Sequence, residues 1–167
     1  MTETQLDLGL LVLRLALGPM LVVHGWNKVF GAGGLTGTEG WFASLGLRPA
    51  WLHARLAPAN EIGAGVLMTL GLLNGLAAMA FVGLMLVATF TDHRGKGYFV
   101  FKGGWEYTVL VAMVAVAIAA LGPGEWSLDH AFGLDLAGTR WAVAAVVGGA
   151  AAAGALMLTS YRPAKPG

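Results

Sequence analysis

Long apolar stretches are the feature of this sequence that most limits its fold. Five windows approach the roughly 20 residues that an α-helix needs to cross about 30 Å of hydrocarbon; they cover residues 8–30, 56–73, 76–92, 105–121 and 141–159. Backbone polar groups inside lipid must be satisfied within the spanning segment, which favours helices. We therefore predict an all-α, polytopic membrane protein with five transmembrane helices.

The composition supports lipid as the surrounding solvent. Of the 167 residues, 57% are hydrophobic and 11% are charged, whereas a soluble domain carries about 25% charged residues. The chain has no cysteine, which excludes disulfides, thiolate metal sites and a thiol nucleophile in this chain. A formal net charge of +1 without a long basic tract gives no indication of nucleic-acid binding.

Turn signals and two long connections organise the chain into one predicted transmembrane domain, residues 1–167. Asn74-Gly75 predicts a tight turn, which makes the second and third helices antiparallel neighbours. Residues 38–47 place large apolar side chains on one helical face, which predicts a short helix in the membrane interface. The basic and aromatic segment 93–104 is also expected to lie against the membrane.

The distribution of positive charge predicts the orientation. With five spans, one side has only Arg140, and the other collects most of the Lys and Arg residues: Lys28, Arg48, Arg55, Arg94, Lys96, Lys102, Arg162 and Lys165. Cytoplasmic loops carry the excess of Lys and Arg. We therefore expect a multi-pass protein of the cell (inner) membrane, with its N-terminus outside and its C-terminus in the cytoplasm.

Ionisable and polar residues inside the apolar segments are the candidate site. Each charge in a span costs roughly 2.5–3.5 kcal/mol on insertion scales and usually faces a bundle interior or a cavity. Four helices bring such groups to the cytoplasmic level, and Arg14 lies about 15 Å further along the first helix on the same stripe. The predicted polar pocket comprises Arg14, His24, Lys28, Asn60, Glu61, Asp92, His93, Glu106 and Tyr107. No residue is assigned a catalytic role.

Structural roles for the same residues remain open alternatives. Those near helix ends can be anchors whose side chains reach the interface, and Glu61 can form a structural ion pair with Arg14 or Lys28. Haem ligation by His24 and His93 is disfavoured, because nothing in the sequence shows that both imidazoles face one cavity. The Glu-x-x-His spacing of two-carboxylate metal sites is missing, so no metal site is predicted.

Small residues dominate the last apolar window. Ala145, Gly149 and Ala153 recur at every fourth position, a pattern that allows close helix approach. The face that they form is expected to pack either on its own bundle or on a partner chain.

Several short motifs carry a family resemblance. They are Arg14, the run His24-Gly-Trp-Asn-Lys28, Ser44-Leu-Gly-Leu47, Glu61 with Gly63 and Gly65, and Gly103-Gly-Trp-Glu-Tyr107. Their order and spacing, over about Leu8 to Asp129, resemble the DoxX family of small membrane proteins. The family's recurring polar positions match Arg14, His24, Lys28, Glu61 and Glu106, followed by Tyr107.

The resemblance implies a four-helix transmembrane bundle, to which residues 141–159 would add a fifth, C-terminal transmembrane helix. It also implies a redox-linked role. The family takes its name from the small subunit of an archaeal thiosulfate:quinone oxidoreductase. We therefore expect a subunit of an oxidoreductase complex related to quinone or thiosulfate, accessory or quinone-proximal rather than a self-sufficient enzyme. Quinone is the expected ligand, no intrinsic cofactor is expected, and the expected partners are other membrane subunits or further copies of the chain. The alternatives are a non-catalytic assembly or stabilising subunit and a small-solute or ion carrier.

Overall fold

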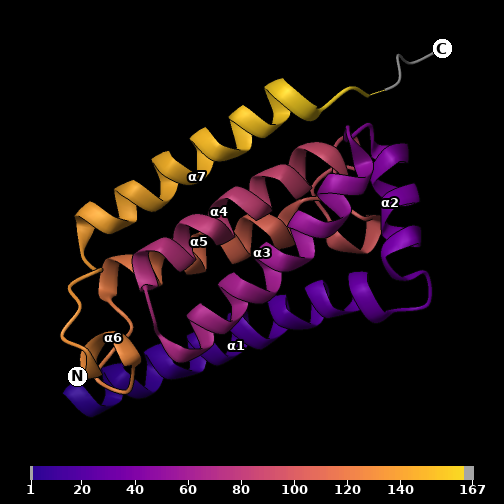
Figure 1. The fold of residues 1–167 in the computed structure, drawn as a ribbon. Helices are drawn as coiled ribbons and strands as arrows, with labels where there is room; N and C mark the ends of the chain where they lie inside the picture. Colours follow the sequence, from indigo (N-terminus) through magenta and orange to yellow (C-terminus); the bar gives the residue numbers. More distant parts are fainter. Residues whose placement is uncertain (1, 164–167) are drawn as a thin grey trace.

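Helices form all the regular secondary structure in the computed structural model, which describes residues 2–163 (Figure 1). The five longer ones are α1 (Glu3–Phe30), α3 (Ala50–Leu70), α4 (Asn74–Thr91), α5 (Glu106–Leu121) and α7 (Thr139–Ser160). Three short helices lie in the connections: α2 (Gly34–Leu45), the 3-10 helix η1 (Val100–Lys102) and α6 (Leu128–Ala131). The all-α prediction is confirmed.

Three of the described helices, α1, α4 and α7, are long and apolar enough to cross a membrane. Helix α5 is apolar but has only 16 residues, a rise of about 24 Å. Helix α3 has 21 residues, but Arg55, Asn60 and Glu61 lower its hydropathy. The count of five membrane spans therefore stays a prediction.

Two helices begin clearly before their predicted starts. Helix α1 begins at Glu3, because Thr2 and Gln5 form a capping box in which each side chain accepts from the other residue's backbone N–H. Helix α3 begins directly after Pro49 and contains Pro58 in its interior. The short helix predicted at 38–47 instead runs from 34 to 45, and the left-handed Gly46 (φ +90°) follows its end.

The five longer helices pack side by side along one common direction (Figure 1). Helix α1 lies along α3, α4 contacts both α3 and α5, and α7 covers α4 and part of α5. Helix α2 lies at one end, where it contacts α1 and α3. The N-terminus and α6 lie at the opposite end (Figure 1).

Glycines let α1 and α3 approach each other closely. A Cβ added to Gly65 would lie 2.6 Å from the carbonyl oxygen of Gly18, and one added to Gly18 would lie 2.7 Å from the oxygen of Gly65. Further along, a Cβ on Gly25 would lie 2.9 Å from the oxygen of Pro58. The two backbones are therefore in contact at positions that only glycine allows.

The small-residue face of α7 packs against its own chain. Ala145, Gly149 and Ala153 are buried, and a Cβ on Gly149 would lie 2.8 Å from the Cβ of Val82 on α4. The end of α7 is joined to the α2–α3 connection by an isolated β-bridge between Leu47 and Tyr161. Of the two packing alternatives for this face, the structure shows the one within the bundle.

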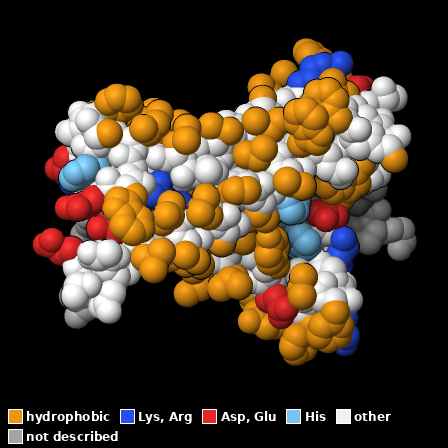
Figure 2. Space-filling view, turned by 90° about the horizontal axis from the view of Figure 1, so that it is seen from below, with side chains coloured by type: hydrophobic (Ala, Val, Ile, Leu, Met, Phe, Trp, Pro, Cys, Tyr) orange, Lys and Arg blue, Asp and Glu red, His pale blue; other side chains and the backbone are white. Residues whose placement is uncertain are grey.

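Charged side chains of opposite sign prevail at the two ends of the molecule (Figure 2). Acidic residues of the N-terminal segment and of the α5–α7 connection lie at the α6 end: Glu3, Asp7, Glu125, Asp129 and Asp135. Eight positive residues were assigned to the predicted cytoplasmic side, and one of them, Lys165, lies outside the described residues. The other seven lie in or next to the helix ends on the side of α2.

Candidate functional site

A cavity of about 330 Å³ lies at the end of the bundle that carries α2, and we call it the α2-end cavity. Helices α1, α2, α3, α4 and α5 and the residues just after α4 all contribute to it. Its wall is mainly apolar, and its ionisable or hydroxyl-bearing lining residues are His24, Lys28, Glu61, Thr91, Asp92, His93, Tyr107 and Thr108. In Figure 2, histidine, acidic and basic side chains gather around a hollow at this end. The structure thus brings six of the nine predicted pocket residues together.

An ion pair joins α1 to α3 at this cavity. The ammonium of Lys28 donates to both carboxylate oxygens of Glu61, at 2.7 and 2.8 Å. Both side chains are largely buried, with 13% and 11% exposed. The pair forms because Gly25, one turn before Lys28, has no side chain to hold α1 away from α3. Of the two partners considered for Glu61, the structure shows Lys28.

A hydroxyl group and an aromatic ring of α2 contact Lys28, the cation of this ion pair. The hydroxyl of Thr38 donates to the backbone oxygen of Lys28 at 2.8 Å. The Nζ atom of Lys28 lies 5.9 Å from the centre of the Trp41 ring, within the range of a cation–π contact. Helix α2 therefore both forms one wall of the cavity and positions the cation.

The two histidines of the cavity have one ring nitrogen each held by the backbone. Nδ1 of His24 lies 2.8 Å from the oxygen of Met20, and Nδ1 of His93 lies 2.6 Å from the oxygen of Gly103. A carbonyl can only accept, so each Nδ1 must carry the proton, and Nε2 of a neutral ring is then an acceptor. Nε2 of His93 also lies 4.0 Å from a carboxylate oxygen of Asp92. Both rings are oriented by the fold and keep Nε2 for other partners.

The double glycine before α5 closes the connection that positions His93 and Tyr107. Gly103 has φ +78°, and a Cβ on Gly104 would lie 2.4 Å from the oxygen of Gly97. This close approach lets the N–H of Glu106 donate to the oxygen of Tyr98 at 2.9 Å, where α5 begins. Tyr107 then lines the cavity, whereas Glu106 does not. The two glycines of the Gly-Gly-x-Glu-Tyr motif therefore allow the close backbone contacts that hold this connection together.

Arg14 belongs to a separate network near the other end of α1. It is 1% exposed, and its guanidinium donates to the backbone oxygens of Thr69, at 3.2 Å, and Trp126. The equally buried carboxylate of Asp129 accepts from the backbone N–H groups of Leu73, at 2.7 Å, and Asn74, at 2.9 Å. A cation at the C-terminal turn of α3 and an anion at the start of α4 both complement the helix dipoles.

The predicted polar stripe is therefore divided between two sites. His24 and Lys28 face the α2-end cavity, whereas Arg14 binds the turn between α3 and α4. Asn60 is exposed on α3 and does not line the cavity, although its neighbour Glu61 does. The capping role of Asp129 could not be predicted from its position between the fourth and fifth apolar windows.

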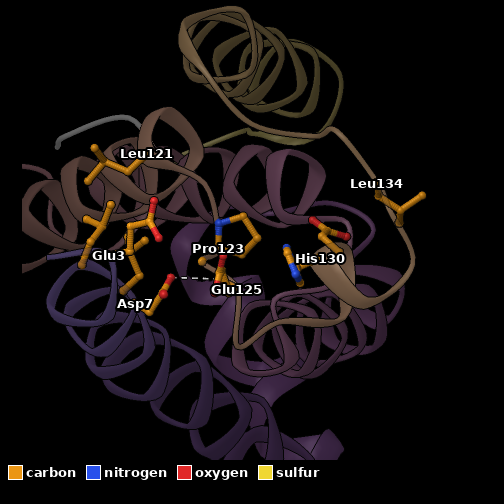
Figure 3. Close-up of a pocket in the computed structure, with 11 residues that line it drawn as sticks. Glu3, Asp7, Leu121, Pro123, Glu125, His130 and Leu134 are labelled. Carbon is orange, nitrogen blue, oxygen red and sulfur yellow. Dashed lines mark hydrogen bonds between the residues drawn. The ribbon is translucent and has the colours of Figure 1, made fainter.

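A second cavity, of about 320 Å³, lies near the N-terminus (Figure 3). Several acidic side chains line it, and Asp7 accepts from the backbone N–H of Glu125 at 2.9 Å, which ties α1 to the loop after α5. Among the residues that the structure describes, no group of three or more His, Asp or Glu side chains could hold a metal ion.

The α2-end cavity, with apolar walls and a few convergent polar groups, has the usual character of a small-molecule site.

Comparison with known proteins gives matches in one family. The DoxX family model matches residues 9–94. The chain is 30% identical over 123 residues to the Bacillus subtilis (strain 168) protein named "Putative oxidoreductase CatD", covering 74% of this chain and 86% of the relative. It is 25% identical over 124 residues to "Inner membrane protein YqjF" of Escherichia coli (strain K12), covering 74% of this chain and 92% of the relative. No solved structure matches the chain.

Proposed function

The chain belongs to the DoxX family of membrane proteins, and on this premise we propose that it is a redox-linked membrane subunit whose α2-end cavity binds the head group of a quinone. The observation that carries the proposal is the cavity itself, in which an apolar wall surrounds a few polar groups from separate helices. The name of the Bacillus subtilis relative, an oxidoreductase, supports the redox link.

The residues of the cavity suit the two oxygens of a quinone ring. Lys28 has three N–H donors, of which Glu61 takes two, so one is left for a ligand oxygen. The phenol of Tyr107 is a further donor for a quinone oxygen, and Nε2 of His24, an acceptor, would suit a hydroxyl of the reduced quinone. The ring of Trp41, which is 41% exposed and lines the cavity, offers an aromatic face for stacking.

Quinone reduction takes up two electrons and two protons, and this chain would contribute to the proton side. Glu61 and Asp92 are carboxylates at the cavity wall that can pass protons between the ligand and the cytoplasmic surface. The electrons would be exchanged with a partner subunit of the same complex. This division of work suits an accessory or quinone-proximal subunit.

The proposed orientation places the cavity on the cytoplasmic side. Five spans, α1, α3, α4, α5 and α7, would put α2 and the end of α7 in the cytoplasm and the N-terminus outside, in line with the excess of described Lys and Arg residues near α2. A reporter fused to the C-terminus should be active only in the cytoplasm. Activity only outside would contradict this orientation.

Filling the cavity tests quinone binding without removing any charge. Ala88 lines the cavity on α4, whereas Ala150 is exposed on α7. We expect Ala88→Phe to weaken binding of a short-tailed quinone to the purified protein at least about tenfold, or 1.4 kcal/mol, in isothermal titration calorimetry. The matched variant Ala150→Phe should bind like the wild type. Equal affinities of both variants and the wild type, or no binding by the wild type, would refute the proposal.

A stabilising subunit is the second candidate, because Lys28 and Glu61 already satisfy each other across α1 and α3. In that role the pair would hold the bundle together and the cavity would stay without a quinone. Glu61→Gln would then lower the yield of the folded complex and leave the turnover of the remaining complex unchanged. If Glu61 acts on protons at the cavity, the turnover of the remaining complex should fall as well.

A further inference from the structure

The connection between α4 and α5, residues 93–105, presents aromatic side chains outward, and we call it the aromatic loop. Phe101 is 77% exposed, and Tyr98 and Phe99 are about half exposed. The rings of Phe99 and Phe101 stack at 5.3 Å, and those of Tyr98 and Trp105 meet edge to face at 4.9 Å. So much exposed aromatic surface in one short segment is typical of an interaction site.

The backbone holds this loop in a defined shape. The N–H of Trp105 donates to the oxygen of Gly97, and the N–H of Gly104 donates to the oxygen of Phe99. Nδ1–H of His93, at the start of the loop, donates to the oxygen of Gly103, near its end. The aromatic side chains are therefore carried by a closed loop, so little conformational entropy would be lost on binding.

The charge of the loop points to an anionic partner. Residues 93–105 contain Arg94, Lys96 and Lys102 and no acidic residue. Lys96 pairs with Asp92 at 3.1 Å, whereas Arg94 and Lys102 are exposed. The Nζ atom of Lys102 lies 6.0 Å from the ring centre of Phe101, so one cation accompanies the most exposed aromatic ring.

We propose that the aromatic loop binds anionic phospholipid head groups at the surface of the bilayer. Phe99 and Phe101 would lie at the boundary between head groups and acyl chains, and Arg94 and Lys102 would bind the phosphates. Aromatic residues concentrate at this depth of the membrane, and each basic side chain near an anionic surface strengthens binding about fivefold. A lipid occupant fits better than a protein partner, because the loop exposes both charged and apolar groups beside a membrane-embedded bundle.

Lipid retention by the full chain tests the charge part of the proposal. The purified protein would be equilibrated with mixed micelles of phosphatidylglycerol and phosphatidylcholine, and bound lipids counted by native mass spectrometry. The double variant Arg94→Gln/Lys102→Gln should lose at least fivefold of the preference for phosphatidylglycerol. Arg140→Gln, at the opposite end, should keep it. An unchanged preference in the double variant would overturn the proposal.

A probe at position 101 tests insertion independently of charge. Because the chain has no cysteine, Phe101→Cys can carry a single fluorophore in vesicles with brominated acyl chains. We expect stronger quenching by brominated phosphatidylglycerol than by brominated phosphatidylcholine. A probe that neither lipid quenches would overturn the proposal and would indicate a protein partner for the loop. Neither measurement uses a quinone, so both outcomes are independent of the cavity's proposed function.

Discussion

The contact between α1 and α3 can be tested at two glycines of α3, because Gly65 is packed closely against α1 and Gly63 is not. A Cβ on Gly65 would lie 2.6 Å from the backbone oxygen of Gly18 and 2.9 Å from the backbone nitrogen of Val22. A Cβ on Gly63 would have nothing within 4 Å. Gly65→Ala should therefore destabilise the protein, whereas Gly63→Ala should not.

The size of the effect follows from the atoms that would have to move. Two of the three nearest neighbours of the Gly65 methyl group belong to the α1 backbone, and the third is Cγ2 of Val22 at 2.8 Å. Rotation of the Val22 side chain would leave both backbone contacts in place, so the helices must separate. Overpacking of this kind costs about 1–3 kcal/mol. Both variants also gain up to about 1 kcal/mol of helix propensity from alanine, so the difference between them isolates the steric term. We expect Gly65→Ala to be less stable than Gly63→Ala by about 1–3 kcal/mol.

Unfolding of the purified variants with SDS in mixed micelles, followed by circular dichroism, would measure this difference in unfolding free energy. Separation of α1 from α3 should also lengthen the Lys28–Glu61 ion pair at the far end of the same contact, so quinone binding in the α2-end cavity should weaken in Gly65→Ala only. Equal stability of the two alanine variants would refute the close packing of these helices.

Three further predictions concern the buried polar groups and use the same unfolding assay. Glu61→Leu leaves the ammonium of Lys28 without its partner and should cost about 3–5 kcal/mol of unfolding free energy. The double variant Lys28→Met/Glu61→Leu should recover most of that loss. A double variant as unstable as the single one would contradict the unpaired ammonium as the cause of the loss. Arg14→Met removes the buried guanidinium that donates to the partly buried carbonyls of Thr69 and Trp126, and it should cost at least about 2 kcal/mol. Near-wild-type stability would show that water replaces the guanidinium. Asp129→Ala removes the acceptor for two backbone N–H groups at the start of α4 and should cost about 1–2 kcal/mol of unfolding free energy. The control Asp135→Ala, at an exposed carboxylate that pairs with Arg140, should change stability by less than about 0.5 kcal/mol. Equal effects of the two variants would contradict the capping role of Asp129.

The helical class and the approximate place of the long helices could be predicted from the sequence. Apolar runs near the length of a membrane span determine where helices form, because the backbone must satisfy its hydrogen bonds within each segment. The helix starts were less predictable. The start of α1 depends on the reciprocal bonds of Thr2 and Gln5, and α3 begins at Ala50, outside the apolar window 56–73 that predicted it.

The sequence also singled out six of the eight ionisable or hydroxyl-bearing residues that line the α2-end cavity, because charged and polar groups in apolar helices stand out individually. It could not decide how they pair. Glu61 meets Lys28 rather than Arg14 because the Gly18, Gly25 and Gly65 contacts set the rotation and separation of α1 and α3.

Only the tertiary structure separates Arg14 from the cavity and joins it, through Thr69, to the turn that Asp129 caps. Hydropathy and helical periodicity are local properties of a segment, and they indicate which face of a helix avoids lipid. Which polar groups meet on that face depends on contacts between segments far apart in the chain, such as α1 with the loop after α5. The fold class was therefore determined by the sequence pattern, and the division of its buried charges between the α2-end cavity and a structural network was decided by helix packing.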